Sequence, residues 1–259
     1  MDDHAINPPD ESSAPDEPTA VGVERVLQLL MQGTLDVQGL MPDSSNYTFL
    51  ASVDDGDLQG LAIYKPRRGE RPLWDFPRGT LCQRETAAYL MSSALGWNVV
   101  PPTVLREGPE YGIGSVQLFI DADQDEHYFS LRGSDDTAFK RIAAFDLIVN
   151  NADRKGGHIL KDRDGHIWGI DHGITFHAEH KLRTVIWEYA GQPIPADLIS
   201  DIERVKEQLD RSDDVLTTAL TQLLDRVEMA ALQRRIERVL RRPRYPEAIG
   251  GRSVPWPPI

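Results

Sequence analysis

The sequence has a single cysteine, Cys82, and no long hydrophobic run. One thiol cannot build an intrachain disulfide framework or a cysteine-rich zinc site, and its helical surroundings suggest a small core residue. No apolar stretch approaches the roughly 20 residues of a transmembrane helix, and no positively charged segment followed by an apolar one opens the chain. We therefore expect a cytoplasmic protein without an integral membrane segment.

Positive charge is also scarce, because 28 Lys and Arg stand against 41 Asp and Glu, a net charge of −13. Nucleic acids bind basic surfaces, so we expect no nucleic-acid partner. One basic cluster is an exception: Arg234, Arg235, Arg238, Arg241, Arg242 and Arg244. Arginines three or four apart share a helix face. This face is either solvated and salt-bridged, or a docking site for an acidic partner or for the chain's own acidic N-terminus.

Composition along the chain predicts an α+β protein of two lobes. Residues 1–20 are rich in Pro, Asp, Glu and Ser, and are predicted to be a disordered acidic tail. Residues 21–120 are expected to form a β-rich N-terminal lobe with one helix against it, and residues 121–242 a mostly helical C-terminal lobe. Residues 243–259 are predicted to be an extended tail, whose Trp256 could pack back on the body.

Local patterns place the main elements. Apolar alternation predicts a hairpin from residues 47–53 and 58–65. Helical spacing predicts a helix behind Thr80 as N-cap, and another over residues 138–150. From residue 197 to 242 the pattern is helical almost throughout, with one break at which Ser212 could cap the next helix.

The most informative stretch is residues 150–160, Asn-Asn-Ala-Asp-Arg-Lys-Gly-Gly-His-Ile-Leu, followed by Ile-Asp-His-Gly at residues 170–173. Apolar runs around a polar turn predict a short hairpin that brings Asp153 and Asp171 together. Phosphoryl transfer needs such a pair, because one carboxylate orients the attacking hydroxyl and the other holds a metal bridging the phosphates. His158 is a further potential metal ligand.

Upstream residues fit the same chemistry. Lys65 ends a predicted strand, and Glu85 lies on the second turn of the helix that follows. A glutamate that fixes a lysine lets it grip the α- and β-phosphates of ATP. Residues 114–120 are predicted to form a strand suited to the hinge that meets the adenine.

These segments, in this order, resemble the phosphatidylinositol 3-/4-kinase superfamily, with the type II phosphatidylinositol 4-kinases as the closest branch. The chain also resembles uncharacterised actinobacterial kinase-like proteins. The resemblance covers residues 40–190 and is carried by six segments: Tyr64-Lys65-Pro66, residues 85–90, residues 98–103, residues 114–119, residues 151–154 and residues 170–173.

The resemblance implies a two-lobed kinase-like fold that uses ATP and Mg²⁺ or Mn²⁺. It implies an ATP-dependent phosphotransferase whose acceptor, a lipid, protein or small-molecule hydroxyl, is unknown. Asp153, Lys65 and Glu85 would be catalytic, and Asp171 and His158 would hold the metal. The residues that would contact the nucleotide are Ser44, Ser45 and Asn46 in a phosphate-covering turn, Lys65, and Gln117, Leu118, Phe119 and Ile120 around the adenine.

The sequence departs from the family at two points. His158 stands where the family usually has a metal-binding asparagine, and an imidazole suits softer metals than Mg²⁺. The cysteine-rich insert of the type II enzymes is replaced by residues 67–79, which have no cysteine. Two alternatives therefore stay open: a nucleotide-binding pseudokinase that works as a scaffold or switch, and an enzyme that transfers AMP.

Overall fold

A computed structural model describes residues 21–41, 46–123, 125–248, 250 and 253–259. The predicted acidic tail and two residues of the predicted phosphate-covering turn, Ser44 and Ser45, lie outside the described residues.

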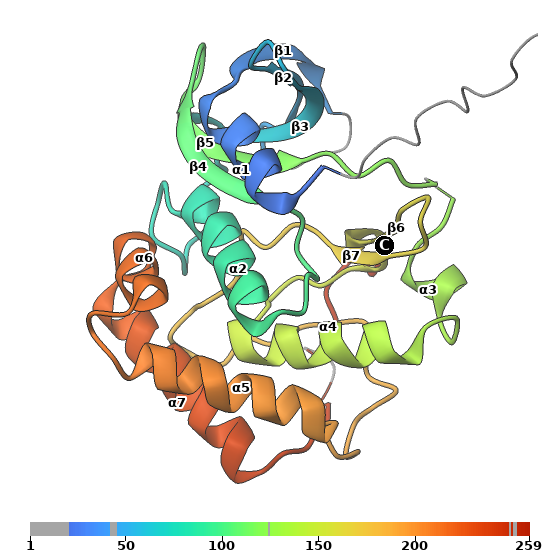
Figure 1. The fold of residues 1–259 in the computed structure, drawn as a ribbon. Coiled ribbons are helices and arrows are strands. Elements are labelled where there is room, and N and C mark those ends of the chain that lie inside the picture. Colours follow the sequence, from blue (N-terminus) through green and yellow to red (C-terminus); the bar gives the residue numbers. More distant parts are fainter. Residues whose placement is uncertain (1–20, 42–45, 124, 249, 251–252) are drawn as a thin grey trace, which may run out of the picture.

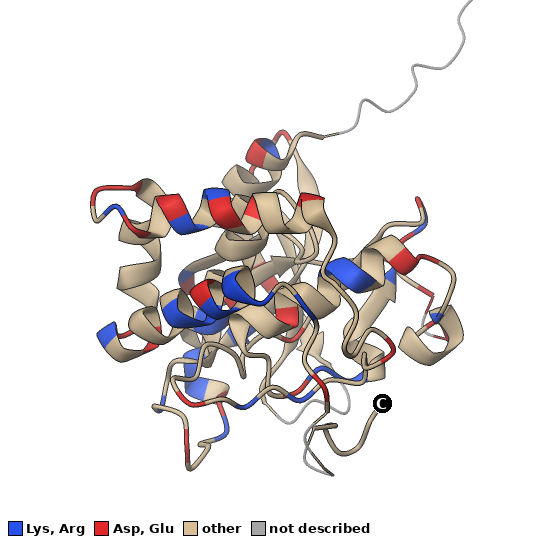
Figure 2. Cartoon of the chain, turned by 90° about the horizontal axis from the view of Figure 1, so that it is seen from below, with Lys and Arg blue, Asp and Glu red and all other residues tan. Residues whose placement is uncertain are grey.

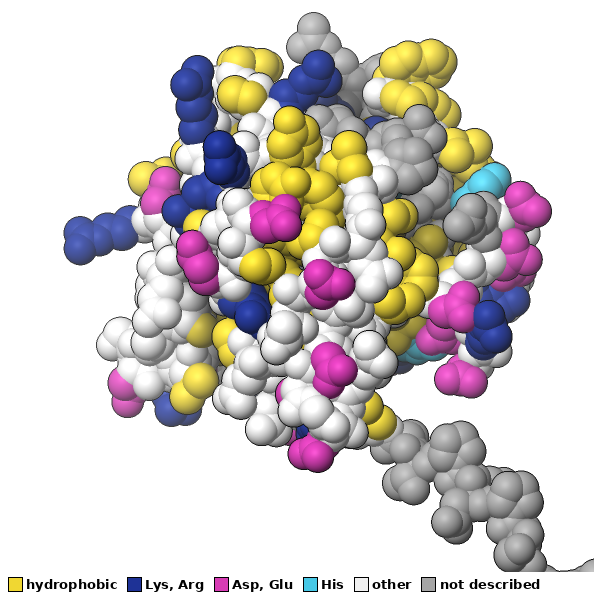
Figure 3. Space-filling view, turned by 90° about the horizontal axis from the view of Figure 1, so that it is seen from above, with side chains coloured by type: hydrophobic (Ala, Val, Ile, Leu, Met, Phe, Trp, Pro, Cys, Tyr) yellow, Lys and Arg dark blue, Asp and Glu magenta, His cyan; other side chains and the backbone are white. Residues whose placement is uncertain are grey.

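The N-terminal lobe is a five-stranded antiparallel sheet in the order β1-β2-β3-β5-β4 (Figure 1). Its strands are β1 (Thr34–Leu40), β2 (Phe49–Asp54), β3 (Gln59–Pro66), β4 (Thr103–Gly108) and β5 (Gly112–Leu118). Helix α1 (Val23–Gln32) packs on the sheet, and a short 3-10 turn, η1 (Arg67–Gly69), follows β3. Seen from above, this lobe presents hydrophobic side chains between scattered charges (Figure 3). Its five strands make the lobe β-rich, as the sequence predicted.

The β2–β3 hairpin shows how local residues set this lobe. Its turn contains Gly56 at φ +91°, a conformation that glycine adopts without steric cost. Asp54 Oδ1 accepts a hydrogen bond from the Gly56 amide at 2.7 Å, and Asp55 Oδ1 accepts one from the Leu58 amide at 3.1 Å. Such aspartate-to-backbone bonds favour turns. The hairpin predicted from apolar alternation is confirmed.

The C-terminal lobe is mostly helical. Its helices are α3 (Tyr128–Leu131), α4 (Asp136–Val149), α5 (Ala196–Leu209), α6 (Val215–Leu223) and α7 (Arg226–Arg241). A turn, η2 (Gly156–His158), leads into the two-stranded sheet of β6 (Ile159–Lys161) and β7 (Ile167–Gly169), which is the predicted hairpin. No helix among the described residues is long and apolar enough to cross a bilayer. The α+β, two-lobed architecture is confirmed.

Helix α2 (Leu81–Leu95) joins the two lobes. It packs on β4 and β5 of the sheet and on α5 and α6 of the helical lobe. Each lobe has its own hydrophobic core, one centred on β2, β3 and β5 and one on α4, α5 and α7. Residues of α2 such as Met91 and Leu95 are buried in the second core. The helix that carries Glu85 is thus held between both lobes.

Two predictions about helix caps need correction. Thr80 occupies the N-cap position of α2 but makes no side-chain cap bond, and its hydroxyl donates to the Pro77 carbonyl at 2.7 Å. Glu70 caps the helix instead, because its Oε1 accepts from the Cys82 amide at 2.9 Å. Asp214, rather than Ser212, caps α6.

The sequence reading also missed two features. Residues 34–40 form an edge strand, β1, and a second break separates α6 from α7. That break is fixed by a capping box between Asp225 and Glu228.

Candidate active site

The cleft between the lobes contains two adjoining cavities of about 200 Å³ and 420 Å³. Thr48, Lys65 and Asp171 line both, so the two cavities lie next to each other. Cavities of roughly 300–1,000 Å³ are typical of small-molecule sites. The cleft therefore has the size of a site for a ligand such as a nucleotide.

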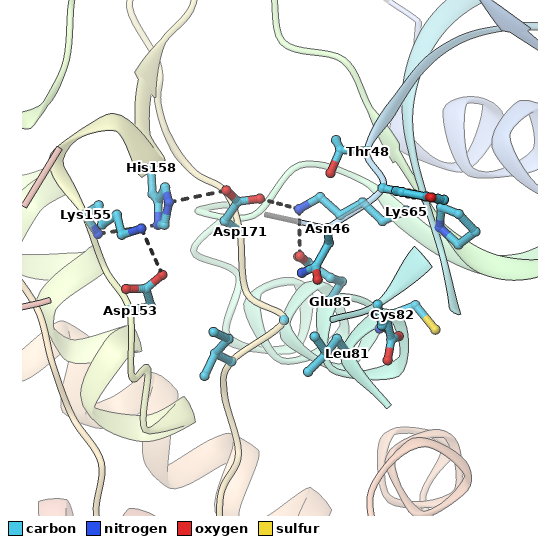
Figure 4. Close-up of a pocket in the computed structure, with 15 residues that line it drawn as sticks. Asn46, Thr48, Lys65, Leu81, Cys82, Glu85, Asp153, Lys155, His158 and Asp171 are labelled. Carbon is cyan, nitrogen blue, oxygen red and sulfur yellow. Dashed lines mark hydrogen bonds and ion pairs between the residues drawn. The ribbon is translucent and has the colours of Figure 1, made fainter. Parts of the chain in front are cut away.

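Strand alternation decides where Lys65 points. Ala62 and Tyr64 on β3 are fully buried in the core of the sheet, so Ile63 and Lys65 point to the opposite face. There, Lys65 Nζ donates a hydrogen bond to Glu85 Oε1 at 2.7 Å and another to Asp171 Oδ1 (Figure 4). The lysine predicted to grip phosphates thus bonds both its predicted partner, Glu85, and the predicted metal ligand, Asp171.

Glu85 connects the lysine to the loop that carries Asp171. It lies on the second turn of α2 and is 4% exposed. Its Oε1 receives Lys65, and its Oε2 accepts a hydrogen bond from the His172 amide at 2.9 Å. One carboxylate therefore sets the position of both the lysine and the Asp171 loop.

Electrostatics favour the charged forms of Lys65 and Asp171. Burial alone would lower the pKa of Lys65, but Asp171 and Glu85 outweigh it and raise that pKa. Burial would raise the pKa of Asp171, but Lys65 and His158 outweigh it and hold that pKa low. Both groups are therefore ionised at neutral pH.

Asp153 lies on the loop after α4 and lines the same cavity as Lys65 and Glu85, with its carboxylate pointing toward Lys155 (Figure 4). Its backbone amide donates to Asn151 Oδ1 at 2.9 Å, and its Oδ2 lies 3.5 Å from Lys155 Nζ. Burial raises the pKa of Asp153, and Lys155 opposes this effect. The side chain is thus held beside a cation whose role the sequence analysis did not foresee.

His158 is adjacent to Asp171, with Nε2 at 3.3 Å from Asp171 Oδ2. Burial lowers the pKa of His158 to about 4, with Asp171 acting in the opposite sense, so the imidazole is neutral at pH 7. A neutral imidazole can be a metal ligand. The described residues contain no group of three or more His, Cys, Asp or Glu side chains that could hold a metal ion by itself. The donor set at this point is one carboxylate and one imidazole.

The two loops rest on a buried charged platform. Arg154 and Asp146, both with fully buried side chains, are joined by Nη2–Oδ1 at 2.9 Å and Nε–Oδ2 at 3.0 Å. Arg154 Nη1 also donates to the Ile170 carbonyl at 2.8 Å, directly before Asp171. This pair therefore locks the Asp153 loop to the Asp171 loop. This pair was not predicted from the sequence, although a lone aspartate in an apolar helix was an available signal.

The predicted adenine-contacting residues Leu118, Phe119 and Ile120 line the larger cavity together with Ile63, Leu160 and Ile170. Gln117 lines it too, but its amide Nε2 donates to Thr103 Oγ1 at 2.8 Å, so that group is committed to β4. Asn46 lines the smaller cavity, where its Oδ1 accepts from the Arg71 amide at 2.7 Å. That bond ties the turn before β2 to the loop after β3.

The C-terminal segment also reaches the cleft. Ile259 lines the larger cavity, and the Pro258 carbonyl accepts a hydrogen bond from the Gly156 amide at 2.7 Å. Trp256 is 89% exposed, so the expectation that it packs on the body is wrong. The residues after it make the contact instead.

The lobes and the site define a kinase-like fold. Among solved structures, the crystal structure of the Golgi casein kinase with Mn/ADP bound is similar at a TM-score of 0.53. It is 14% identical, and the match covers 85% of this chain and 74% of that one. The likeness establishes the fold.

The sequence itself has a clear relative. Protein Rv2133c of Mycobacterium tuberculosis (strain ATCC 25618 / H37Rv) is 38% identical over 264 residues, covering 88% of this chain and 94% of that protein. The chain belongs to the same family as this protein. No model of a known protein family matches the sequence.

The chain is also similar to part of a lipid kinase. Phosphatidylinositol 4-kinase gamma 4 of Oryza sativa subsp. japonica is 31% identical over 173 residues, which cover 58% of this chain and 31% of that protein.

Proposed function

We propose that the protein is an ATP-dependent phosphotransferase of the kinase type. The observation that carries the proposal is the position of Lys65, which bonds Glu85 and Asp171 in a cavity that Asp153 also lines. A lysine fixed by a helical glutamate, a metal-binding aspartate and an aspartate for the acceptor hydroxyl are the parts that phosphoryl transfer uses. The kinase-like fold supports this assignment.

The nucleotide would occupy both cavities. Its adenine would lie in the larger one, whose apolar lining includes Ile63, Leu118 and Ile170. Its phosphates would reach Lys65, which is already charged and oriented. Because Lys65 is held before the nucleotide arrives, less side-chain freedom is lost on binding.

The donor set suits a divalent ion bound partly by substrate. Mg²⁺ usually takes one or two carboxylates, with phosphates and water completing the shell, and imidazole also suits transition metals. Asp171 and His158 would hold the ion, which would neutralise charge on the phosphates. We therefore propose Mg²⁺ or Mn²⁺, and the Mn/ADP complex of the Golgi casein kinase supports the choice.

Asp153 would orient the acceptor hydroxyl and accept its proton. Its raised pKa, caused by burial, brings its basicity closer to that of a useful general base. Lys155, 3.5 Å away, would limit the shift and compensate charge on the transferring group.

Different observations favour different acceptors for the phosphoryl group. The partial match to a phosphatidylinositol 4-kinase favours relationship with the phosphatidylinositol 3-/4-kinases and a lipid hydroxyl. The acidity of the chain and the absence of a cysteine-rich insert favour a protein or small-molecule hydroxyl instead. A cytoplasmic location remains our prediction, because it would supply ATP.

A nucleotide-binding pseudokinase is the second candidate. It is favoured by His158, an imidazole at the position where the resembled family has a metal-binding asparagine, directly beside Asp171. Such a protein would bind ATP and act as a scaffold or switch.

The deciding experiment measures ATP binding and turnover on one sample with Mg²⁺ and with Mn²⁺, beside Asp171→Asn. Metal-dependent turnover that is lost in the variant supports the kinase. ATP-dependent stabilisation without turnover at either metal supports the pseudokinase, and no ATP binding at all rejects both. Label from γ-labelled but not α-labelled ATP on the product separates phosphate transfer from AMP transfer.

A further inference from the structure

A second concave region lies on the C-terminal lobe, away from the proposed catalytic cleft. A cavity of about 730 Å³ lies between α4, α7 and the segment after α7, and a smaller one of about 70 Å³ adjoins it. The two share His180, Arg235 and Arg238. Neither has a described lining residue in common with the cleft.

The lining is strongly basic. Figure 2, which views the molecule from below, shows Lys and Arg concentrated along α7, whereas α5 mixes both signs. Arg235, Arg238, Arg242 and Arg244 line the larger cavity, with Glu247 as the acidic residue in its lining. Within the described part of the chain, none of these four arginines forms an ion pair. Among the described residues, the expected salt bridges are therefore absent from these four arginines, whereas the expected solvation holds for Arg238, Arg242 and Arg244, which are exposed.

Arg235 shows that the site is built into the core. It is 9% exposed, its Nε donates to the Ile148 carbonyl at 2.9 Å, and its Nη1 donates to the His177 carbonyl at 3.0 Å. Its buried Nη2 has no hydrogen-bond partner among the described residues. A buried polar group without a partner is costly, and for a charged group more so. An anion bound close to this guanidinium would offset part of that cost.

The neighbouring charges point the same way. Burial, followed by the adjacent Arg234 and Arg238, lowers the pKa of Arg235 to about 10. Burial, followed by Arg238 and Arg235, also lowers the pKa of His180. Glu228 acts on Arg235 in the opposite sense but does not outweigh these effects, so positive charge is in excess here.

The rest of the lining is apolar. Leu147, Val239, Tyr245 and Pro246 contribute to the larger cavity. A pocket with an apolar wall and a few convergent polar groups suits a small molecule rather than a flat protein surface. Several guanidinium groups suit a phosphate, because its oxygens accept paired hydrogen bonds from them.

We propose that this pocket, between α4 and α7, binds an organic phosphate that carries an apolar body. The phosphate would contact Arg238 and Arg242, next to the buried guanidinium of Arg235, and the apolar body would lie against Leu147 and Val239. The site is distinct from the proposed catalytic cleft and goes beyond the proposed transfer reaction. Its ligand could be a soluble molecule or the headgroup of a membrane lipid, which share this chemistry.

Calorimetric titration of the full chain with dihexanoyl phosphatidic acid tests the proposal, with inorganic phosphate and dihexanoyl phosphatidylcholine as comparisons. We expect the phosphatidic acid to bind at least tenfold more tightly than either comparison. The double variant Arg238→Gln/Arg242→Gln should lose at least tenfold, whereas the control Arg211→Gln/Arg226→Gln should not change. The control removes two exposed arginines that line neither cavity, one of them on α7 itself.

Further arms separate the sources and the two sites. Sedimentation with phosphatidylcholine vesicles, with and without phosphatidic acid, supports a membrane lipid if binding needs both phosphatidic acid and the two arginines. Binding of dissolved dihexanoyl phosphatidic acid without binding to the vesicles supports a soluble phosphate. Equal binding of inorganic phosphate, or unchanged binding in the double variant, overturns the proposal. Asp171→Asn should leave this binding intact, so failure of the catalytic assignment would not affect it.

Discussion

Arg154 and Asp146 form an ion pair in which neither side chain has exposed surface, directly beneath the loops that carry Asp153 and Asp171. Removing one partner of a buried pair leaves an uncompensated charge, which typically costs about 3–5 kcal/mol. We expect Asp146→Asn to lower the free energy of unfolding in urea by that amount. Asp210→Asn, which breaks the exposed pair of Lys206 and Asp210, should cost less than about 1 kcal/mol. Equal losses in the two variants would show that the buried pair does not hold the loops.

The second prediction concerns Glu85 and Lys65. Glu85→Gln keeps the shape of the side chain but removes its charge and one of its two acceptor oxygens, so Lys65 and the His172 amide can no longer both be bonded as they are by Glu85. Hydrogen bonds to charged groups contribute about 1.5–3 kcal/mol, so ATP affinity should fall by about 10- to 100-fold.

Titration of the variant with ATP, followed by calorimetry, measures the loss. Glu179→Gln is the matched control, because Glu179 also pairs with a lysine, Lys181, at 3.9 Å, but its side chain is 81% exposed and lines neither cavity of the cleft. If both variants bind ATP equally well, Glu85 has no part in holding the phosphate-binding lysine.

The third prediction concerns the only thiol. Cys82 is 2% exposed, and burial, followed by the carboxylate of Glu70, raises its pKa to about 12. An unfolded cysteine has a pKa of about 8.5. Above that pH the unfolded chain loses a proton that the folded chain keeps, so the folded state is destabilised. The contribution of the thiol to stability is therefore complete below pH 8.5 and declines as the pH rises towards 12.

Comparison with Cys82→Ala isolates this effect, because every other titrating group is common to both chains. Between pH 9 and 10, the free energy of unfolding of the native chain should fall by about 1.4 kcal/mol per pH unit relative to that of Cys82→Ala. Urea denaturation at pH 7.5, 9 and 10 provides the measurement. A difference that stays constant over this range would mean that the thiol titrates normally in the folded protein.

The sequence was sufficient for elements whose signal is local. The β2–β3 hairpin, the helix α4 and the β6–β7 hairpin each combine clear periodicity with turn residues. The order of the motifs also brought Lys65, Glu85 and Asp171 together correctly, because each lies at the end or on an early turn of a well-predicted element.

Tertiary contacts decided what the sequence could not. The cap of α2 comes from Glu70, which reaches the helix only after the loop behind β3 has folded back. The partner of Arg154 is Asp146, which is buried in α4. Arg235 was expected on a solvated face of arginines but is buried in the core. Each of these side chains is polar, and its burial depends on the packing of a segment that is distant in the sequence. Periodicity alone therefore gave no indication of its contacts.

The last prediction concerns metal preference and rests on the proposed function. His158 Nε2 lies 3.3 Å from Asp171 Oδ2, so it is placed to share an ion with that carboxylate. Mg²⁺ prefers oxygen ligands, whereas imidazole is a good ligand for transition metals. His158→Asn replaces the nitrogen donor by an amide that can offer oxygen, so the ratio of turnover with Mg²⁺ to turnover with Mn²⁺ should rise several-fold.

Steady-state turnover with each metal, together with calorimetric titration of the metal in the presence of ADP, measures this ratio for the native chain and the variant. The matched control is His166→Asn, the same substitution in the turn of the β6–β7 hairpin, where the ring contacts the Asn98 carbonyl at 2.8 Å and lines neither cavity of the cleft. A rise confined to His158→Asn places the imidazole at the metal. An identical ratio in all three proteins would instead mean that His158 orients Asp171 through their contact, and that the ion is bound by Asp171 and the phosphates alone.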